Sequence, residues 1–210
     1  MNLKKLVGAA VLLLGFGSLA FAEEEGMYAK LTIGYTHGGV NADWNYYNNS
    51  TYNYTLYYAG FEIMPAFGFQ LPVFDDKPFS LSLEAQLPIT IGGDEDGYWE
   101  SDTTIVEPAA ICFFNWHFGK QFAEPLQKLV PYGGLGFGIP IEHVSYKFKY
   151  WNGSKYIKYS DDSTEIGFKM NMTLGARYDF TKQIGALVEW NHGFIGEYSW
   201  SFRIGAVYRF

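Results

Sequence analysis

The last thirteen residues of the chain, Tyr198 to Phe210, constrain the fold most strongly, because apolar and polar side chains alternate along them. Aromatic or aliphatic residues occupy every even position. The odd positions carry serine, arginine or glycine, with Val207 as the one exception. Alternation with a period of two predicts a β-strand whose two faces meet different surroundings. The strand ends on an aromatic side chain, Phe210.

The first 22 residues have the three parts of a secretory signal peptide. Two lysines precede an apolar run from Leu6 to Gly17, and the small-residue motif Ala20-Phe21-Ala22 follows it. The run is shorter than the about 20 apolar residues that a spanning helix requires. We therefore expect residues 1–22 to be removed and residues 23–210 to form one exported domain.

Composition excludes several classes of function. The formal charge of -7 becomes -9 when Lys4 and Lys5 leave with the signal peptide, and an acidic chain is a poor partner for nucleic acid. The single cysteine, Cys112, cannot support a disulfide framework and is interpreted as a small apolar residue on a strand. No cofactor-binding motif is found. Aromatic residues make up 20% of the chain and favour strands and membrane interfaces.

The alternation predicts eight strands. They span residues 27–39, 55–71, 79–92, 102–119, 130–150, 166–180, 184–194 and 198–210. Long loops are expected at 40–54, 93–101 and 151–162, and one helical turn within 120–129. The apolar set of the fifth strand changes phase near His143, which predicts a β-bulge there. Pro65, Pro88, Pro108 and Pro140 fall within strands, where we expect bulges or bends.

The size of the apolar faces indicates which side of the sheet faces inward. A soluble lipocalin-like barrel also has eight alternating strands, with its apolar face inside. Here the apolar faces hold roughly fifty residues, more than an eight-stranded barrel can enclose. We therefore predict that they face lipid and that the lumen carries charges of both signs. The predicted lumen network comprises Glu62, Glu84, Glu189, Lys169, Arg177 and Arg203. Glu189 is expected to bridge to Arg177 or Arg203.

Several segments resemble those of a known family. Arg203, Gly205, Tyr208 and Phe210 match the C-terminal insertion signal of bacterial outer-membrane β-barrels. Residues 130–136 and 174–180 look like strand openings and endings of the small eight-stranded barrels of the OmpA transmembrane-domain and OmpW type. The resemblance covers residues 23–210.

This resemblance implies an all-β, eight-stranded antiparallel up-and-down transmembrane β-barrel. It would lie in the outer membrane of a Gram-negative bacterium as a monomer, with both termini in the periplasm. Its partners would be outer-membrane lipids and, during insertion, the barrel-assembly machinery.

The family resemblance leaves several functions open. It implies a structural or narrow-pore role with aromatic and acidic extracellular loops. The alternatives are OmpW-type transport of small apolar solutes, and adhesion or ligand binding through the loops. Exposed aromatic side chains suit such binding. The candidate binding residues are Trp44, Tyr46, Tyr47, Tyr52 and Tyr54. An open lumen with a gap in the wall would favour transport over a structural role.

Candidate chemical sites are weak, and we do not expect an enzyme. His143-Val144-Ser145 resembles the His–x–Ser pair of outer-membrane lipid A deacylases, but the spacing to Glu165 does not match that family. A lipid-modifying barrel enzyme is therefore a remote alternative. The acidic segment from Asp94 to Asp102 is either a solvated loop or a Ca²⁺ site. The four histidines lack a metal-ligand spacing.

Overall fold

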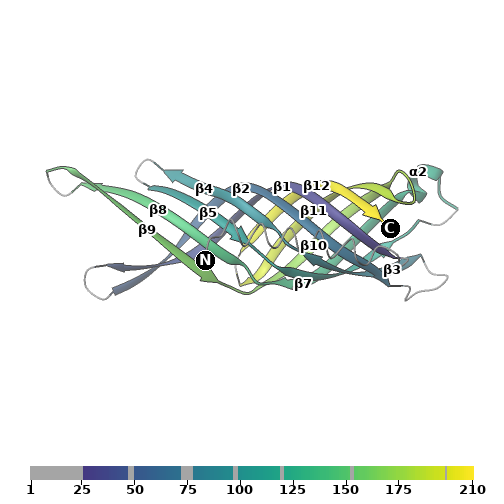
Figure 1. Ribbon diagram of the computed structural model, residues 1–210, viewed down its shortest axis with the longest axis horizontal. Helices are drawn as coiled ribbons and strands as arrows, with labels where there is room; N and C mark the ends of the chain where they lie inside the picture. Colours follow the sequence, from purple (N-terminus) through teal and green to yellow (C-terminus); the bar gives the residue numbers. More distant parts are fainter. Residues whose placement is uncertain are drawn as a thin grey trace.

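The computed structural model describes residues 26–46, 50–71, 78–96, 99–118, 121–151, 154–196 and 198–210. These residues form a closed, antiparallel, eight-stranded barrel that is nearly all strand (Figure 1). One short helix, α2 (Glu124–Gln127), lies within the segment where a helical turn was expected. No helix among the described residues is long and apolar enough to cross a membrane.

Twelve strand segments build the eight strands of the barrel. Four strands are unbroken and four are interrupted once. The unbroken strands are β1 (Met27–Tyr46), β2 (Ser50–Leu71), β11 (Ile184–Gly196) and β12 (Ser199–Arg209). The interrupted ones are β3 (Phe79–Gln86) with β4 (Ile89–Asp96), β5 (Trp99–Val106) with β6 (Ala109–Trp116), β7 (Leu129–Gly138) with β8 (Ile141–Trp151), and β9 (Tyr156–Ile166) with β10 (Lys169–Asp179).

Three of the four interruptions occur at a proline. Proline has no backbone N–H and therefore cannot donate a hydrogen bond to the neighbouring strand. The breaks occur at Leu87–Pro88, Glu107–Pro108 and Ile139–Pro140, as the positions of these prolines predicted. Each proline carbonyl still accepts a bond from the next strand. These are backbone hydrogen bonds, and Pro65 within β2 accepts one as well. The N–H groups of Leu87, Glu107, Ile139 and Gly167 donate to the carbonyl oxygens of Pro65, Pro88, Pro108 and Pro140, respectively. The sheet therefore stays continuous across the breaks.

The first and last strands close the barrel. Tyr28 pairs with Arg209, and the register continues to Gly38 opposite Ser199. On its other side β1 pairs with β2 along its whole length. We call the end that carries α2 and the last residue the turn end. The opposite end, where the β1–β2, β4–β5 and β8–β9 hairpins project, is the hairpin end (Figure 1).

Among the side chains that the structure describes, each strand keeps one face toward the lumen, apart from one register shift. On β7 and β8 the buried side chains Val130, Glu142, Val144 and Tyr146 are all even-numbered, so the predicted bulge near His143 is wrong. The one register shift recorded lies between Met170 and Asn171, opposite Ile195 and Gly193 on β11. Phe194 is the additional residue there, and consequently both Phe194 and Ile195 are exposed.

The apolar pattern changes because the surroundings change along the barrel. Leu31, Phe61 and Leu135 point outward with about half of their surface exposed, as expected for a lipid-facing band. At the hairpin end the arrangement reverses. Tyr58, Ile105, Val144 and Tyr146 form an apolar cluster inside the barrel.

The expected long loops are largely strand. Residues 40–46 and 50–54 pair as a β1–β2 hairpin, from Val40 opposite Leu56 to Tyr46 opposite Ser50. The acidic segment pairs as the β4–β5 hairpin, and β9 begins at Tyr156 opposite Trp151. Cross-strand pairing, which local composition does not reveal, sets these boundaries.

Candidate functional site

The structure places all six predicted lumen residues inside the barrel, each at most 9% exposed. They come from five of the eight barrel strands and lie on the polar face that alternation assigned to the interior. Lys30, Glu107 and Glu142 are buried beside them. Buried charges are tolerated only when they are paired and hydrogen-bonded, so their partners decide what the lumen can do.

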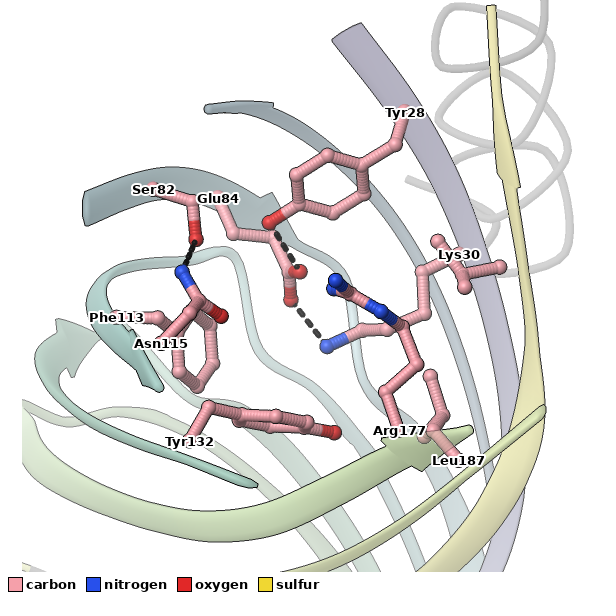
Figure 2. A pocket seen from close by; sticks show the side chains of 10 residues that line it. Tyr28, Lys30, Ser82, Glu84, Phe113, Asn115, Tyr132, Arg177 and Leu187 are labelled. Carbon is pink, nitrogen blue, oxygen red and sulfur yellow. Dashed lines mark hydrogen bonds and ion pairs between the residues drawn. The ribbon is translucent and has the colours of Figure 1, made fainter. Parts of the chain in front are cut away.

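Lys30 is the centre of the network near the turn end. Its Nζ lies 2.8 Å from Glu189 Oε1 and also pairs with Glu84. Tyr28 donates a hydrogen bond of 3.0 Å to Glu84, and Tyr132 donates one of 3.0 Å to Glu189. Figure 2 shows Tyr28 and Lys30 converging on the Glu84 carboxylate. The two carboxylates thus share one ammonium group.

The expected partners of Glu189 are therefore wrong. Arg203 stands opposite Glu189 in the β11–β12 register, but its guanidinium pairs with Glu62. Arg177 pairs with Asp179, with 2.9 Å between Nε and Oδ1. Lys30 reaches Glu189 because it stands on β1, the strand beyond β12, and its long side chain crosses the narrow lumen.

Two further ion pairs close the middle of the lumen. Arg203 and Glu62 form one, and Thr90 donates a bond of 3.4 Å to the same carboxylate. Lys169 and Glu107 form the other, with Asn171 donating a bond of 2.6 Å to Glu107. All three ion-paired clusters are buried, and side chains rather than solvent satisfy most of their polar atoms.

Lumen-facing glycines let these groups reach across an intervening strand. Gly68 stands between Tyr28 and Glu84 in the paired register, and a Cβ at this glycine would collide with the Tyr28 ring. Gly175 stands in the same way between Tyr132 and Glu189. A Cβ on Gly175 would lie 2.5 Å from Tyr132 Cζ.

Gly34 separates Arg203 from Glu62 in the same manner. A Cβ there would lie 3.0 Å from Arg203 Cγ. Each of these bridges therefore depends on the absence of one side chain.

The turn end has its own charged cluster. Asp179 accepts hydrogen bonds from Arg177, at 2.9 Å, and from Arg209, at 2.5 Å. Nearby, Ser80 Oγ lies 2.9 Å from His117 Nε2. Burial lowers the pKa of His117, and the charge of Arg177 lowers it further. The surroundings of His117 at the turn end therefore favour the neutral form of its imidazole.

Two small cavities lie against the charged network in the part of the barrel that the structure describes. One cavity of about 20 Å³ lies beside Tyr28, Lys30, Glu84 and Arg177. Another of about 10 Å³ lies beside Glu62, Glu107, Glu142, Lys169 and Arg203. A cavity needs roughly 10–15 Å³ to hold one water molecule. The larger cavity therefore has room for one or two water molecules and the smaller for at most one.

The predicted insertion-signal residues divide between the two faces of β12. Arg203 is buried in the lumen and Gly205 lies on the same face, whereas Tyr208 and Phe210 point outward. The Phe210 ring lies 5.2 Å from that of Tyr208 and 6.5 Å from that of Phe67. This cluster belongs to the outer surface near the turn end.

The predicted loop aromatics lie in the β1–β2 hairpin. Trp44 stands opposite Tyr52, and Tyr54 stands opposite Ala42. Tyr47 and the side chains of the other four lie outside the described part of the structure. The structure therefore assigns Trp44, Tyr46, Tyr52 and Tyr54 to strands and does not describe a binding surface.

The candidate chemical residues are not brought together. His143 Nδ1 lies 3.0 Å from Thr164 Oγ1, and no hydrogen bond joins it to Ser145 among the described contacts. Glu165 pairs with Glu142, so it lies on the opposite face of the sheet from His143 and Ser145. Within the described ranges, no group of three or more potential ligands is placed to hold a metal ion.

Comparison with known proteins identifies the architecture. A family model described as the outer membrane protein beta-barrel domain matches residues 8–210. The crystal structure of Neisserial surface protein A (NspA) is 12% identical, with a TM-score of 0.54, covering 89% of this chain and 100% of that one. No match was found among curated proteins.

Two other solved structures are similar. Ail, the attachment invasion locus protein of Yersinia pestis, is 14% identical with a TM-score of 0.47, covering 89% of this chain and 100% of that one. The N-terminal β-barrel domain of Pseudomonas aeruginosa OprF is 16% identical with a TM-score of 0.35, covering 89% and 98%.

Proposed function

The chain belongs to the outer membrane protein β-barrel family, and from that membership we propose that it is a closed, membrane-anchored scaffold that displays its hairpins outside the cell. The turn end and both termini face the periplasm, and the hairpin end faces outward. Outer-membrane lipids surround the barrel. The protein acts as a monomer and performs no catalysis.

The charged lumen is the observation that carries this proposal. Three buried ion-paired clusters, around Lys30, Arg203 and Lys169, occupy the interior at successive positions between the ends. Cavities of about 20 and 10 Å³ lie beside these clusters. Moving a solute through this lumen would require several buried pairs to separate, and each broken pair costs about 3–5 kcal/mol. These features favour a structural role over transport through the lumen.

Conductance of the refolded protein in planar bilayers tests the closed lumen. We expect no stable open-channel steps from the wild-type protein. The triple variant Lys30→Ala, Glu84→Ala, Glu189→Ala removes the cluster around Lys30 without leaving one of its charges unpaired, and should admit more ions. Steady single-channel conductance from the wild-type protein, unchanged in the triple variant, would refute the closed-scaffold proposal.

The proposal includes recognition of the C-terminal insertion signal by the barrel-assembly machinery. Tyr208 and Phe210 point away from the lumen, so the assembly machinery can reach both rings while the lumen face of β12 packs inward. Arg203 and Gly205 then serve the interior. The two faces of one strand therefore have separate tasks.

A second candidate function is ligand binding at the hairpin end. Its support is that three hairpins extend beyond the point where β11 and β12 end (Figure 1). On β8, Lys147 and Lys149 are exposed to the outside, above the lipid-facing band. A surface of this polarity suits contact with water and with soluble partners.

A further inference from the structure

A notch opens in the outer wall of the barrel, over strands β2, β3, β6 and β7, with a volume of about 460 Å³. It is distinct from the lumen cavities, because aromatic, aliphatic and alanine side chains on the outward faces of these strands form it. Glu84 borders it as well, but its carboxylate faces the lumen and pairs with Lys30. We call this feature the outer notch.

Two paired alanines form the floor of the outer notch. Ala85 on β3 stands opposite Ala110 on β6. In the same row of the sheet, Phe67 on β2 pairs with Ala85, and Phe137 on β7 pairs with Ala110. The two phenylalanines are three strand spacings apart, which places their backbones about 14 Å from each other. Between these tall sides the wall carries only methyl groups in this row.

The next row toward the turn end extends the floor. Cys112 stands there between Leu83 on β3 and Leu135 on β7, and its side chain is exposed. Phe114 is the next outward residue of β6, and its ring lies 4.9 Å from that of Phe79. These two rings bound the outer notch on the side of the turn end.

The outer notch lies near half-height of the barrel. The row of paired residues that holds Ala85 and Ala110 can be followed around the whole wall. It starts at Tyr208 on β12, opposite Ile184, the first residue of β11. It returns to β11 at Ile195, one residue from the end of that strand. The row climbs because barrel strands are tilted, and β3 and β6 lie halfway along its circuit.

The height of the outer notch determines what can fill it. The chain belongs to a family of outer-membrane barrels, whose outward apolar band is surrounded by hydrocarbon. Lipid headgroups and soluble proteins stay at the two surfaces of a bilayer, whereas acyl chains reach its middle. An empty notch would lose dispersion contacts along its floor and sides. A flexible chain restores them, and it touches the protein on three sides there but on one side elsewhere on the wall.

A second barrel fits the outer notch less well. In hydrocarbon, apolar surfaces gain nothing from leaving water, so association depends on close packing. The wall of another barrel is convex and would meet Phe67 and Phe137 before it reached the alanine floor. About a dozen residues line the notch, fewer than the about 20–30 residues that each partner contributes to a typical stable interface.

We propose that the outer notch binds one acyl chain of a membrane lipid, which lies over Ala85 and Ala110 and passes beside Cys112. The bound chain exchanges with the surrounding lipid more slowly than chains elsewhere on the wall, because it makes more contacts with the protein. The proposal adds a lipid site to the proposed scaffold. It requires the outward face to meet lipid, and it is independent of whether the lumen conducts.

Photo-crosslinking tests the site with the full-length protein. The barrel is reconstituted in phosphatidylcholine vesicles that contain a small fraction of phosphatidylcholine with a diazirine near the end of one acyl chain. Peptide mass spectrometry after irradiation measures lipid adducts at Cys112, relative to adducts at Ile33, an exposed outward residue of β1 outside the notch. A second lipid carries the diazirine next to its headgroup.

Two matched variants separate the notch from the rest of the wall. Ala110→Phe fills the floor, and Ala186→Phe makes the same change at an outward alanine of β11. With the diazirine at the chain end, we expect Ala110→Phe to lower the ratio of Cys112 to Ile33 adducts about fivefold. Ala186→Phe should leave this ratio unchanged. The diazirine next to the headgroup should give few adducts at Cys112, because the notch lies at mid-height.

An unchanged ratio in Ala110→Phe would overturn the proposal, and so would frequent Cys112 adducts from the diazirine next to the headgroup. If the wild-type ratio falls as the protein-to-lipid ratio is raised, a second barrel occupies the notch, which also overturns it. Should Ala110→Phe fail to fold, Ala85→Phe fills the same floor from the neighbouring strand and has the same expected result. Conductance of the lumen is measured separately and is not affected by these outcomes.

Discussion

Lys30 is the residue on which the buried carboxylates of Glu84 and Glu189 both depend. Glu84 and Glu189 both pair with its ammonium group, and neither carboxylate has another cation in direct contact among the described residues. The side chain of Lys30 also lies 5.2 Å from the centre of the Phe113 ring, a cation–π distance. Removing the ammonium would leave two buried negative charges near each other.

We predict that Lys30→Met lowers the free energy of unfolding by about 3–5 kcal/mol, because it strands buried carboxylates without a partner. Urea titration of the barrel in lipid vesicles measures the change. The control is Lys147→Met, which breaks the exposed pair between Lys147 and Glu100 at 3.1 Å. That loss should be at most about 1 kcal/mol. Equal losses in the two variants would contradict the central role of Lys30.

Glycine is as important to the network as the charges are. Tyr132 passes over Gly175 to reach Glu189, and the two partners are separated by the strand that carries this glycine. A methyl group at Gly175 would meet the Tyr132 ring, which is itself confined by Phe113 at 5.5 Å in an edge-to-face contact. The ring therefore has little freedom to move aside.

We predict that Gly175→Ala destabilises the barrel by about 1–3 kcal/mol through overpacking. The matched control is Gly133→Ala on the neighbouring strand. Its new Cβ would lie 3.3 Å from the flexible end of Leu174, which can shift. Thermal unfolding followed by circular dichroism compares the two. If Gly175→Ala leaves the unfolding temperature unchanged and Tyr132 keeps its hydrogen bond to Glu189, the network does not need the space at Gly175.

At the scale of the strand, alternation in the sequence was sufficient to predict the number of strands and the direction of every lumen charge discussed above. Alternation could not predict which charged side chains form ion pairs with each other. Lys30, Glu84 and Glu189 are far apart in the chain, and their contact depends on the barrel diameter and on which side chains can cross the lumen. The lumen-facing glycines were the one sequence signal that could have indicated which positions communicate.

The misplaced bulge has a physical cause. The apolar residues on β7 point outward at Leu135 and Phe137 and those on β8 point inward at Val144 and Tyr146, although the strand keeps its phase. We infer that lipid surrounds the barrel at the first pair and that water surrounds it at the second pair, whose side chains are therefore buried in the interior cluster. The apolar face changes sides between the two pairs. Sequence periodicity alone cannot distinguish a change of phase from a change of solvent.

The last strand leads to a prediction about assembly. Deleting Phe210 should reduce the amount of protein inserted in the outer membrane, because it removes an outward aromatic ring of the insertion signal. Membrane fractionation measures the yield. The control is Phe202→Ala, an exposed aromatic position on the same strand but outside the signal. If the protein without Phe210 inserts normally, the assembly machinery does not require Phe210 for recognition.

At the scale of the whole molecule, the two ends differ in construction. The turn end has a short helix, the tight connection between β10 and β11, and the Arg177–Asp179–Arg209 cluster. The hairpin end has long paired strands and an apolar interior cluster. Long segments on one side and short turns on the other are typical of outer-membrane barrels, whose longer loops face outward.

This asymmetry predicts the orientation of the protein in the membrane. Single cysteines at Glu95 and Tyr156, both exposed at the hairpin end, should react with a membrane-impermeant maleimide on intact cells. A cysteine at Gln127, exposed on α2, should react only after the outer membrane is permeabilised. The native Cys112 is exposed on the lipid-facing surface and must first be replaced by alanine, a residue that already occupies the neighbouring outward position, Ala110. Labelling of Gln127→Cys on intact cells, with Glu95→Cys and Tyr156→Cys protected, would reverse the orientation.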